Sequence, residues 1–295
     1  MSIVFSEYFQ KNTLRIKITG NCNMNCSFCH GEGYMHGLDN ISPDDDLFCK
    51  IKEICKKESI KDIVITGGEP LLNPDLSLII SGISKLDNID SIRLVTNGTI
   101  EYSPQDWGGL VNAGLSFVTF SIHTQNSINI HGEGLQRQLI NLQYAKDCKI
   151  HTKINIVAFD NINTLNTVYD LLIDITNTDL VLLNNVYDVE KSINIINSFL
   201  SEHRFIETQL VSRSGTSNNI KVYHNDRDKV IYVKQHSLYQ DDRYCNNCTL
   251  YNEGKCNEGY YGLRLEKHNG QLFVRACLDR HDLKTHIPVV DFCNS

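Results

Sequence analysis

Three cysteines within one short segment are the residues of this chain best suited to chemistry. Cys22, Cys26 and Cys29 stand in the sequence NCNMNCSFCH. Three thiolates on one loop can wrap one face of a cubane iron–sulfur cluster and leave one iron open to a small molecule that chelates it. The alternatives are a zinc site, with His30 as a fourth ligand, or unrelated cysteines. Zinc sites favour paired cysteines two residues apart with a second pair nearby, and this segment has no such second pair.

A second group of cysteines lies towards the C-terminus. In a reducing cytosol such residues are metal ligands or thiols rather than disulfides. By residue type this group could be a four-thiolate zinc ribbon or a second iron–sulfur cluster, and the presence of the first cluster favours the second reading. Its members are Cys245, Cys248, Cys256 and Cys277. The sequence assigns no role to Cys49, Cys55, Cys148 and Cys293.

Polar segments follow several apolar runs, where backbone or side chains could bind a ligand. Thr66–Pro70 reads Thr-Gly-Gly-Glu-Pro. Its two glycines let the backbone approach a ligand closely, and the carboxylate of Glu69 suits an ammonium group. Thr96–Gly98 and Ser121 end the next two runs. Taken singly, each of these is also ordinary turn chemistry.

The elements that position these segments are short apolar runs alternating with helical patterns. Near-continuous apolar strands between helices indicate a parallel sheet. Six such units predict an α/β fold, a partial (β/α)6 barrel, in which the chemistry lies at the C-terminal ends of the strands. The expected strands are Leu14–Thr19, Asp62–Thr66, Ile92–Thr96, Phe117–Ile122, Lys153–Val157 and Leu180–Leu183. The expected helices include Asp45–Lys57, Pro74–Leu86, Leu135–Asp147 and Thr164–Ile175.

This alternation breaks near residue 186. A further helix is expected over Glu190–Ser201, and residues 204–236 alternate in strand fashion around a polar turn. The rest is rich in Cys, Gly, Asn and Tyr, with too few apolar clusters for a core of its own, and small segments of that kind fold around a metal. We therefore expect two domains, residues 1–203 for the barrel and residues 204–295 for a small C-terminal iron–sulfur region.

Composition narrows the class of protein. The 295 residues are 41% hydrophobic and 21% charged, which is ordinary globular composition, and the formal net charge is −7. An acidic chain lacks the basic face that a general nucleic-acid or membrane-surface binder needs. No apolar run approaches the ~20 residues that span a bilayer, and the N-terminus lacks a secretory signal. We expect a cytoplasmic protein with no nucleic-acid or membrane partner.

The first cysteine segment and the polar segments together resemble the radical S-adenosylmethionine (SAM) superfamily. C-x3-C-x2-C with an aromatic residue before the last cysteine is that family's signature, and Gly-Gly-Glu-Pro resembles its GGEP segment. The resemblance implies that a reduced 4Fe–4S cluster cleaves SAM, and that the resulting 5′-deoxyadenosyl radical abstracts a hydrogen atom from a small-molecule substrate. An electron donor such as flavodoxin or ferredoxin is implied as a partner. SAM-binding roles are implied for Phe28, Gly67, Gly68, Glu69, Pro70, Thr96, Asn97 and Ser121.

The C-terminal region resembles that of the MoaA family, the GTP cyclases that begin molybdenum-cofactor biosynthesis. Tyr261–Glu266 contains the family's L-R-L strand, and Ala276–Leu278 its later cysteine. The resemblance implies a twitch/SPASM-like region in which Cys245, Cys248 and Cys277 hold an auxiliary 4Fe–4S cluster. It also implies substrate-binding roles for Arg15, Lys153 and Arg264.

Several departures from that family bear on the substrate. The interval between Cys248 and Cys277 is longer than is usual in the family and carries Cys256, which as a fourth ligand would close the auxiliary cluster. Gly262 stands where the family has an earlier arginine. The chain ends in Phe-Cys-Asn-Ser instead of a Gly-Gly tail. A pocket poorer in arginines predicts a substrate less anionic than a nucleoside triphosphate.

One tetrapeptide matches a sequence of the MoaA family at the wrong place in the order of elements. Arg204–Glu207 copies a family sequence of the last barrel strand, but it follows one helix too late, because Leu180–Asn185 already takes that strand's place. In register, Val181 stands where the family's arginine should be. Arg204 is therefore not assigned to the site.

Three functions compete on these grounds. The first is a MoaA-like enzyme acting on a nucleotide, either GTP or a nucleotide of a specialised pathway. The second is a radical SAM dehydrogenase or carbon-linking enzyme acting on a sugar or peptide, with the auxiliary cluster accepting an electron. An open auxiliary iron favours the first and a four-cysteine cluster the second. The third is a zinc-bound interaction protein with degenerate SAM motifs, which the intact GGEP and Thr-Asn-Gly segments disfavour.

Overall fold

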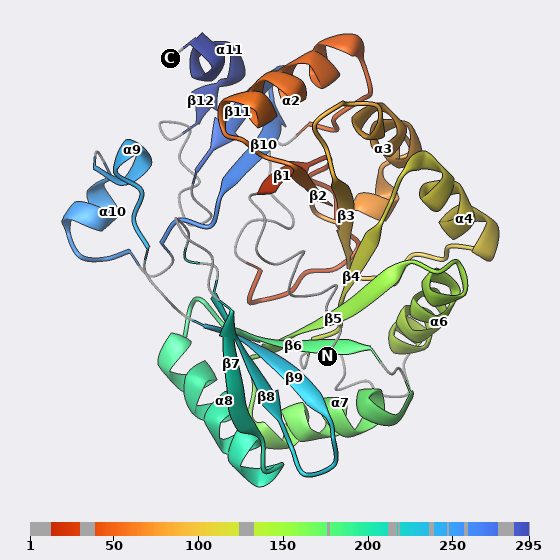
Figure 1. Cartoon of the computed structure of the whole chain (residues 1–295), viewed down its shortest axis with the longest axis vertical. Helices are drawn as coiled ribbons and strands as arrows, with labels where there is room; N and C mark the ends of the chain where they lie inside the picture. Colours follow the sequence, from red (N-terminus) through yellow and green to blue (C-terminus); the bar gives the residue numbers. More distant parts are fainter. Residues whose placement is uncertain are drawn as a thin grey trace. The chain divides into compact units, whose positions relative to one another are not determined.

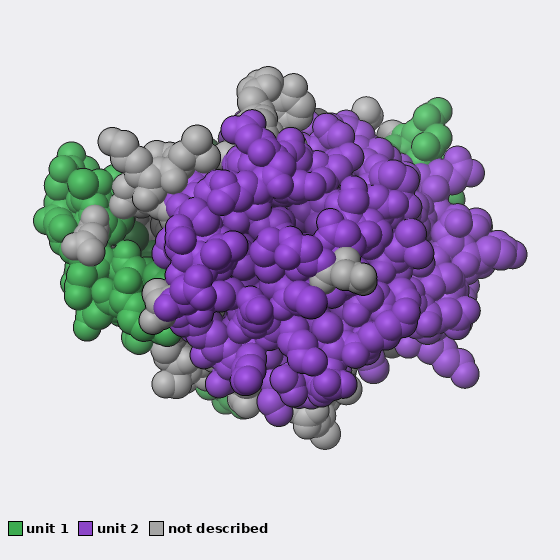
Figure 2. Space-filling view, turned by 90° about the horizontal axis from the view of Figure 1, so that it is seen from above, with its two compact units in different colours: residues 1–10, 120–140, 152–260 green, residues 11–119, 141–151, 261–295 purple. Residues whose placement is uncertain are grey.

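The structure is a computed structural model of the chain, and it divides into two compact units. Unit 1 comprises residues 1–10, 120–140 and 152–260, and unit 2 comprises residues 11–119, 141–151 and 261–295 (Figure 2). The residues described are 13–29, 39–123, 133–175, 178–211, 217, 219–235, 239–246, 248–256, 259–276 and 286–294.

Unit 2 begins as a run of parallel strands linked by helices. β1 pairs in parallel with β2, and β2 with β3. On its other side β1 pairs in parallel with β10, which continues through the antiparallel strands β11 and β12, so the strand order is β12-β11-β10-β1-β2-β3 (Figure 1). The strands are β1 (Thr13–Lys17), β2 (Asp62–Thr66), β3 (Ser91–Thr96), β10 (Leu263–His268), β11 (Gln271–Arg275) and β12 (Ile287–Pro288). The helices are α2 (Asp45–Lys57), the short 3₁₀ turn η1 (Pro70–Leu72), α3 (Leu76–Ser84), α4 (Pro104–Ala113) and α11 (Val289–Asn294).

Local sequence explains where these elements begin and end. Asp44 caps α2 by accepting the Leu47 N–H at 2.7 Å. Ser103 and Asp106 form a reciprocal capping box at the start of α4, and Gly114 ends that helix with φ of +116°, a conformation that favours glycine. All five residues of β2 are buried, as expected of a parallel strand covered on both faces.

Unit 1 holds the later strands of the chain. β5 pairs in parallel with β6, and β6 in parallel with β9, after which β8 and β7 continue the sheet antiparallel. Its strands are β5 (His151–Ala158), β6 (Asp179–Asn184), β7 (Ile206–Val211), β8 (Asn219–His224) and β9 (Val230–Gln235). Its helices are α7 (Ile162–Ile175), α8 (Val189–Glu202), α9 (Asp242–Cys245) and α10 (Thr249–Asn252). The boundaries between the units fall within β4 (Phe117–Ser121) and α6 (Glu133–Asp147) and at the start of β5.

The alternation of strands and helices predicted from the sequence is confirmed. Each expected strand is present to within two residues at either end, and the polar-turn region 204–236 resolves into β7, β8 and β9. The helix α4 was not among those predicted. The division into residues 1–203 and 204–295 stays a prediction. No helix in the described ranges is long and apolar enough to cross a membrane.

Candidate functional site

The first cysteine loop leaves the end of β1 in unit 2. The Ile18 N–H donates to the Thr66 carbonyl at 3.0 Å and extends the β1–β2 pairing, after which the chain turns away. The Cys29 N–H donates to the Cys26 carbonyl at 3.0 Å and closes a tight turn. Burial, and then the charges of Glu69, Cys26 and Cys29, raise the pKa of the Cys22 thiol. The three thiols are therefore close enough to interact as one group.

The Gly-Gly-Glu segment packs its backbone against this loop. The Gly68 N–H donates to the Thr19 carbonyl at 2.8 Å, and the Glu69 N–H donates to the Asn21 carbonyl at 2.7 Å. A Cβ on Gly68 would fall 2.1 Å from the Asn21 carbonyl oxygen, and one on Gly67 would fall 2.6 Å from that of Thr19. No real Cβ tolerates such contacts, so only glycine lets the two segments lie this close.

Glu69 is fully buried and accepts several hydrogen bonds. Its Oε1 accepts the Thr96 hydroxyl at 2.6 Å and the Leu71 N–H at 3.0 Å, while Oε2 accepts the Asn97 N–H at 2.7 Å. Burial raises the pKa of Glu69 to about 7, although these hydrogen bonds act in the opposite direction. A buried carboxylate in this state is suited to receive a cationic group, which would favour its ionised form.

A network of polar side chains joins the end of β3 to the cysteine loop. Asn97 Nδ2 donates to Asn23 Oδ1 at 2.9 Å and lies 4.0 Å from the sulfur of Cys22. Asn23 in turn donates to the Thr99 hydroxyl at 2.8 Å. Sequence reasoning missed Asn23 and Thr99, although an asparagine directly after the first cysteine was a usable signal. The network fixes the loop to the strand end that carries Thr96 and Asn97.

Three further residues are predicted to bind SAM, and they lie at separate places in the fold. Phe28 is buried directly before Cys29, and Pro70 opens η1 after Glu69. Ser121 lies in unit 1, where its carbonyl accepts the Gln138 side-chain amide at 3.1 Å. His30, the fourth ligand of the alternative zinc site, lies outside the described residues.

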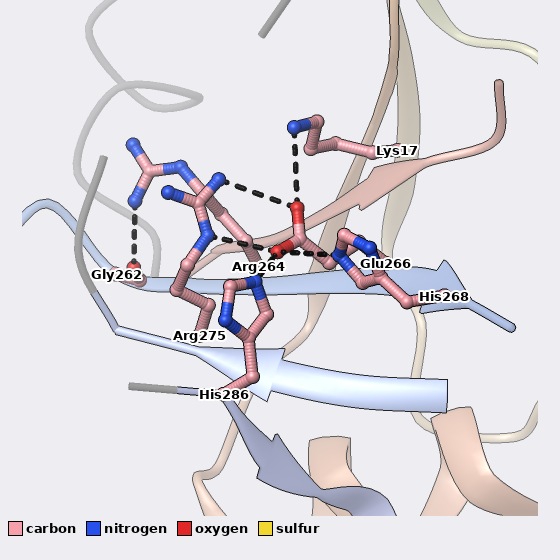
Figure 3. Close-up of polar contacts among 7 residues, drawn as sticks. All are labelled: Lys17, Gly262, Arg264, Glu266, His268, Arg275 and His286. Atoms are coloured by element: carbon pink, nitrogen blue, oxygen red, sulfur yellow. Dashed lines mark hydrogen bonds and ion pairs between the residues drawn. The ribbon is translucent and has the colours of Figure 1, made fainter. Parts of the chain in front are cut away.

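Two of the three predicted substrate-binding cations meet in unit 2. Arg15 of β1 is paired directly with Arg264 of β10, so their side chains leave the same face of the sheet. Arg264 is only 3% exposed and donates to the Gly262 carbonyl at 3.4 Å (Figure 3). Gly262 has φ of +113°, a conformation that L side chains rarely adopt, so an arginine at this position would be strained. Lys153, the third cation, lies in β5 of unit 1, paired in register with Asp179.

Three cysteines of the second group gather in unit 1. The Cys248 N–H donates to the Cys245 carbonyl at 2.8 Å, and the Cys256 sulfur accepts the Gly259 N–H at 3.4 Å. Burial, and then the charges of Cys256 and Cys248, raise the pKa of the Cys245 thiol. Cys256 therefore lies with Cys245 and Cys248. Cys277 lies outside the described residues.

Arg204 lies after α8 and not in β6, which occupies the place of the last barrel strand. It has a positive φ of +54° in the turn between α8 and β7, and its exposed side chain reaches Asp226 at 3.4 Å. Val181, by contrast, is buried within β6.

Comparison with known families identifies this arrangement. A model described as the Radical SAM superfamily matches residues 16–172, more than half of the chain. The chain belongs to the radical SAM superfamily. The match begins within β1 and covers the cysteine loop and the Gly-Gly-Glu segment.

Several relatives of this radical SAM chain are named for the same activity. It is 27% identical over 256 residues to a probable GTP 3′,8-cyclase of Methanothermobacter marburgensis, covering 80% of this chain and 79% of the relative. It is 24% identical over 298 residues to a GTP 3′,8-cyclase of Staphylococcus aureus, covering 92% and 84%. A shorter match, 38% identical over 118 residues, joins 38% of the chain to 35% of the Aquifex aeolicus GTP 3′,8-cyclase.

Solved structures share the fold. SuiB of Streptococcus suis, bound to S-adenosylmethionine, matches with a TM-score of 0.56 and 14% identity over 96% of this chain and 63% of its own. A second, anSMEcpe with bound AdoMet, matches with a TM-score of 0.51 and 19% identity over 65% of this chain and 58% of its own. The chain thus spans less than two thirds of either solved protein. Both likenesses confirm the predicted α/β radical SAM fold.

The residues present fit the cofactors of this superfamily. Three interacting thiols on one loop, with only sulfur donors among them, suit a 4Fe–4S cluster with one iron left open. When bound, the cluster supplies the electron that cleaves SAM to a 5′-deoxyadenosyl radical. The part predicted for this chain is to hold the cluster through Cys22, Cys26 and Cys29 and to receive the SAM ammonium group at Glu69. These residue assignments stay predictions.

Proposed function

We propose that this radical SAM enzyme abstracts a hydrogen atom from a nucleotide. The observation that carries the proposal is the direct pairing of Arg15 with Arg264 on adjacent strands. Like charges opposite each other in a sheet are destabilising, so their cost is offset when an anionic group lies between them. Guanidinium groups match the geometry of phosphate oxygens. The names of the relatives, GTP 3′,8-cyclases, support a nucleotide as the substrate class.

Further roles are proposed for Lys153 and for the second cysteine group. We assign Lys153 as a third cation for the substrate and Cys245, Cys248 and Cys277 as ligands of an auxiliary 4Fe–4S cluster. Flavodoxin or ferredoxin is the proposed electron donor. Each of these roles rests on the family resemblance, and none requires a particular nucleotide.

A second candidate is favoured by the position of Cys256. Its charge acts on Cys245 together with that of Cys248, so a fourth thiol is at hand for an auxiliary cluster. A cluster with four cysteine ligands has no iron open to the substrate, and its use would be structural or electron-transferring. That chemistry fits a dehydrogenase or carbon-linking enzyme acting on a sugar or peptide.

The test is substrate-dependent SAM cleavage. The enzyme, reconstituted anaerobically, is incubated with SAM, dithionite and one nucleotide at a time, GTP first, and 5′-deoxyadenosine is measured by chromatography. A nucleotide substrate should raise its rate of formation above that with SAM alone, and deuterium on the nucleotide should appear in the 5′-deoxyadenosine. If no nucleotide does either, while a sugar or peptide does, the second candidate replaces the first.

A further inference from the structure

A buried polar cluster in unit 2, not used by the site above, is centred on the carboxylate of Glu266 in β10. Glu266 is fully buried. Lys17 Nζ lies 3.1 Å from Oε2, and Arg275 donates through Nε to Oε1 at 3.0 Å and through Nη2 to Oε2 at 3.3 Å. Figure 3 shows the two cations reaching the carboxylate from different sides. The Glu266 cluster is Lys17, Glu266, His268, Arg275 and His286.

The two histidines of the cluster meet the same carboxylate oxygen. His286 Nε2 hydrogen-bonds Oε1, and His268 Nε2 lies 3.4 Å from it. Burial alone would raise the pKa of Glu266, but the two histidines, Lys17 and Arg275 outweigh burial and hold that pKa well below its usual range. Glu266 is therefore an anion at neutral pH.

Glu266, His268 and His286 could also be taken for metal ligands, since their ligand atoms lie within 4.8 Å of one another. The positions of Lys17 and Arg275 argue against a metal site. Both carboxylate oxygens already contact Lys17 or Arg275, and a divalent ion at the same oxygens would be repelled by two positive charges at close range. The cluster is an ion-pair centre.

The sheet register connects this cluster to Arg15 and Arg264, the arginine pair. β1 and β10 run parallel, so two residues beyond the arginine pair Lys17 and Glu266 face each other on the same side of the sheet. On the far side of β10, Arg275 is paired with Arg264. Three arginines thus stand in one row across β1, β10 and β11.

Like charges that lie opposite each other on neighbouring strands repel, so the arginine row destabilises the register in which β1, β10 and β11 pair. A shift of one residue between β1 and β10 would turn one arginine to the opposite face and relieve the repulsion. The same shift would separate the buried charges of Lys17 and Glu266, which is costly. The ion pairs of Glu266 therefore oppose the repulsion that the arginine row creates.

We propose that Glu266 is a positioning residue, which holds the arginine pair in register so that it binds a phosphoryl group of the substrate. This inference rests on the substrate role proposed for the arginine pair. Glu266 itself does not touch the substrate; it acts through Lys17 and Arg275.

The test separates the charge of Glu266 from its geometry. Glu266→Asp keeps the charge and shortens the side chain, whereas Glu266→Gln keeps the length and removes the charge. Binding of inorganic pyrophosphate and of GTP is measured by calorimetry on the reconstituted holoenzyme with SAM present. The matched control is Glu207→Gln, which removes a carboxylate from the exposed ion pair with Lys221 in unit 1.

A positioning role predicts that both Glu266 variants bind pyrophosphate about tenfold more weakly, while the control binds as the unmodified enzyme does. The electron paramagnetic resonance change on SAM binding should persist in Glu266→Asp, which shows that the cluster loop is intact. A role through charge alone predicts instead that Glu266→Gln binds pyrophosphate more tightly and Glu266→Asp equally. Either of those results overturns the proposal, and Glu266→Asp alone decides if Glu266→Gln does not fold.

The two proposals fail in different ways. If the unmodified enzyme binds pyrophosphate but no nucleotide, the proposed function is wrong and the role of Glu266 is still tested by its variants. If GTP binds and the variants bind it unchanged, the proposed function stands and the inference is wrong. If neither ligand binds, the sheet face takes no oxyanion and the inference is wrong.

Discussion

At the scale of single residues, the buried carboxylate of Glu69 lowers the stability of the folded state and is suited to bind a cation. A fully buried carboxylate with three hydrogen bonds has its pKa raised to about 7 because burial outweighs them. In the absence of a cation, ionising this group works against the folded state. The SAM ammonium would supply the missing charge.

Stability measurements on Glu69→Gln should reveal the unfavourable free energy of ionising Glu69 in the folded state. A carboxyl pKa raised on folding contributes stability below its unfolded value of 4.5, and that contribution is lost as pH rises through about 7. Between about pH 4 and pH 8 the SAM-free enzyme should therefore lose about 3 kcal/mol relative to Glu69→Gln. Urea unfolding at both pH values checks the difference. A difference that does not change with pH would contradict the assignment.

The thiols of the first loop give a second prediction at this scale. Cys29→Ala removes one of three predicted cluster ligands, so reconstituted enzyme should lose about four irons per chain and form no 5′-deoxyadenosine. The control is Cys148→Ala, a cysteine outside both groups that contacts the Pro104 carbonyl. Iron analysis and chromatography measure the two effects. Full iron and activity in Cys29→Ala would rule out the predicted ligand set.

At the scale of elements, the site depends on how closely the loop after β1 meets the loop after β2. The ladder between the two strands continues through Ile18, and the glycines that follow β2 hydrogen-bond the backbone of the cysteine loop. Because the contact is between backbones, no side chain can replace it. The sequence identified the two glycines as candidates, and only the structure shows how closely their backbone approaches the cysteine loop.

Gly68→Ala tests that contact. The added Cβ would lie 2.1 Å from the Asn21 carbonyl oxygen, so the two loops must separate, and SAM affinity should fall about tenfold or more. The matched control is Gly108→Ala in α4, where a Cβ meets nothing within 4 Å and alanine favours the helix by about 1 kcal/mol. Equilibrium binding of SAM to both variants checks this. Equal affinity would show that the loops do not need to touch.

At the scale of the whole molecule, the number of clusters tests whether the auxiliary cluster is present. Two 4Fe–4S clusters predict about eight irons per reconstituted chain. About four irons would remove the auxiliary cluster, and zinc in place of iron would contradict the predicted metal sites. Elemental analysis with Mössbauer spectroscopy distinguishes these outcomes.

Cys256→Ala then decides the type of the second cluster. If Cys256 is a ligand, the variant should lose iron from the auxiliary site and keep the SAM-dependent signal of the first cluster. If the second cluster assembles unchanged, its fourth iron is open, which favours the nucleotide substrate. The proposed ligands Cys245, Cys248 and Cys277 predict that the second cluster assembles unchanged, whereas loss of iron would support the second candidate, which the grouping of Cys256 with Cys245 and Cys248 favours.

The sequence by itself determined the superfamily and the order of strands and helices, and it predicts the residues of the SAM site. These depend on local spacing and on hydrophobic periodicity, both of which are written along the chain. It also predicts that Arg204 lies outside the site, because the number of strands and helices before Arg204 can be counted along the chain. The helix α4 escaped prediction, since its two adjacent glycines weaken a helical pattern that the capping box restores.

Only the tertiary structure decided what lies side by side. Arg15 and Arg264 are far apart in sequence, and nothing in either segment predicts that β10 pairs with β1 in a register that sets them opposite each other. The Glu266 cluster follows from the same pairing, because its members come from three strands and the segment before β12. Long-range pairing depends on the packing of whole elements, and periodicity within one segment does not contain it.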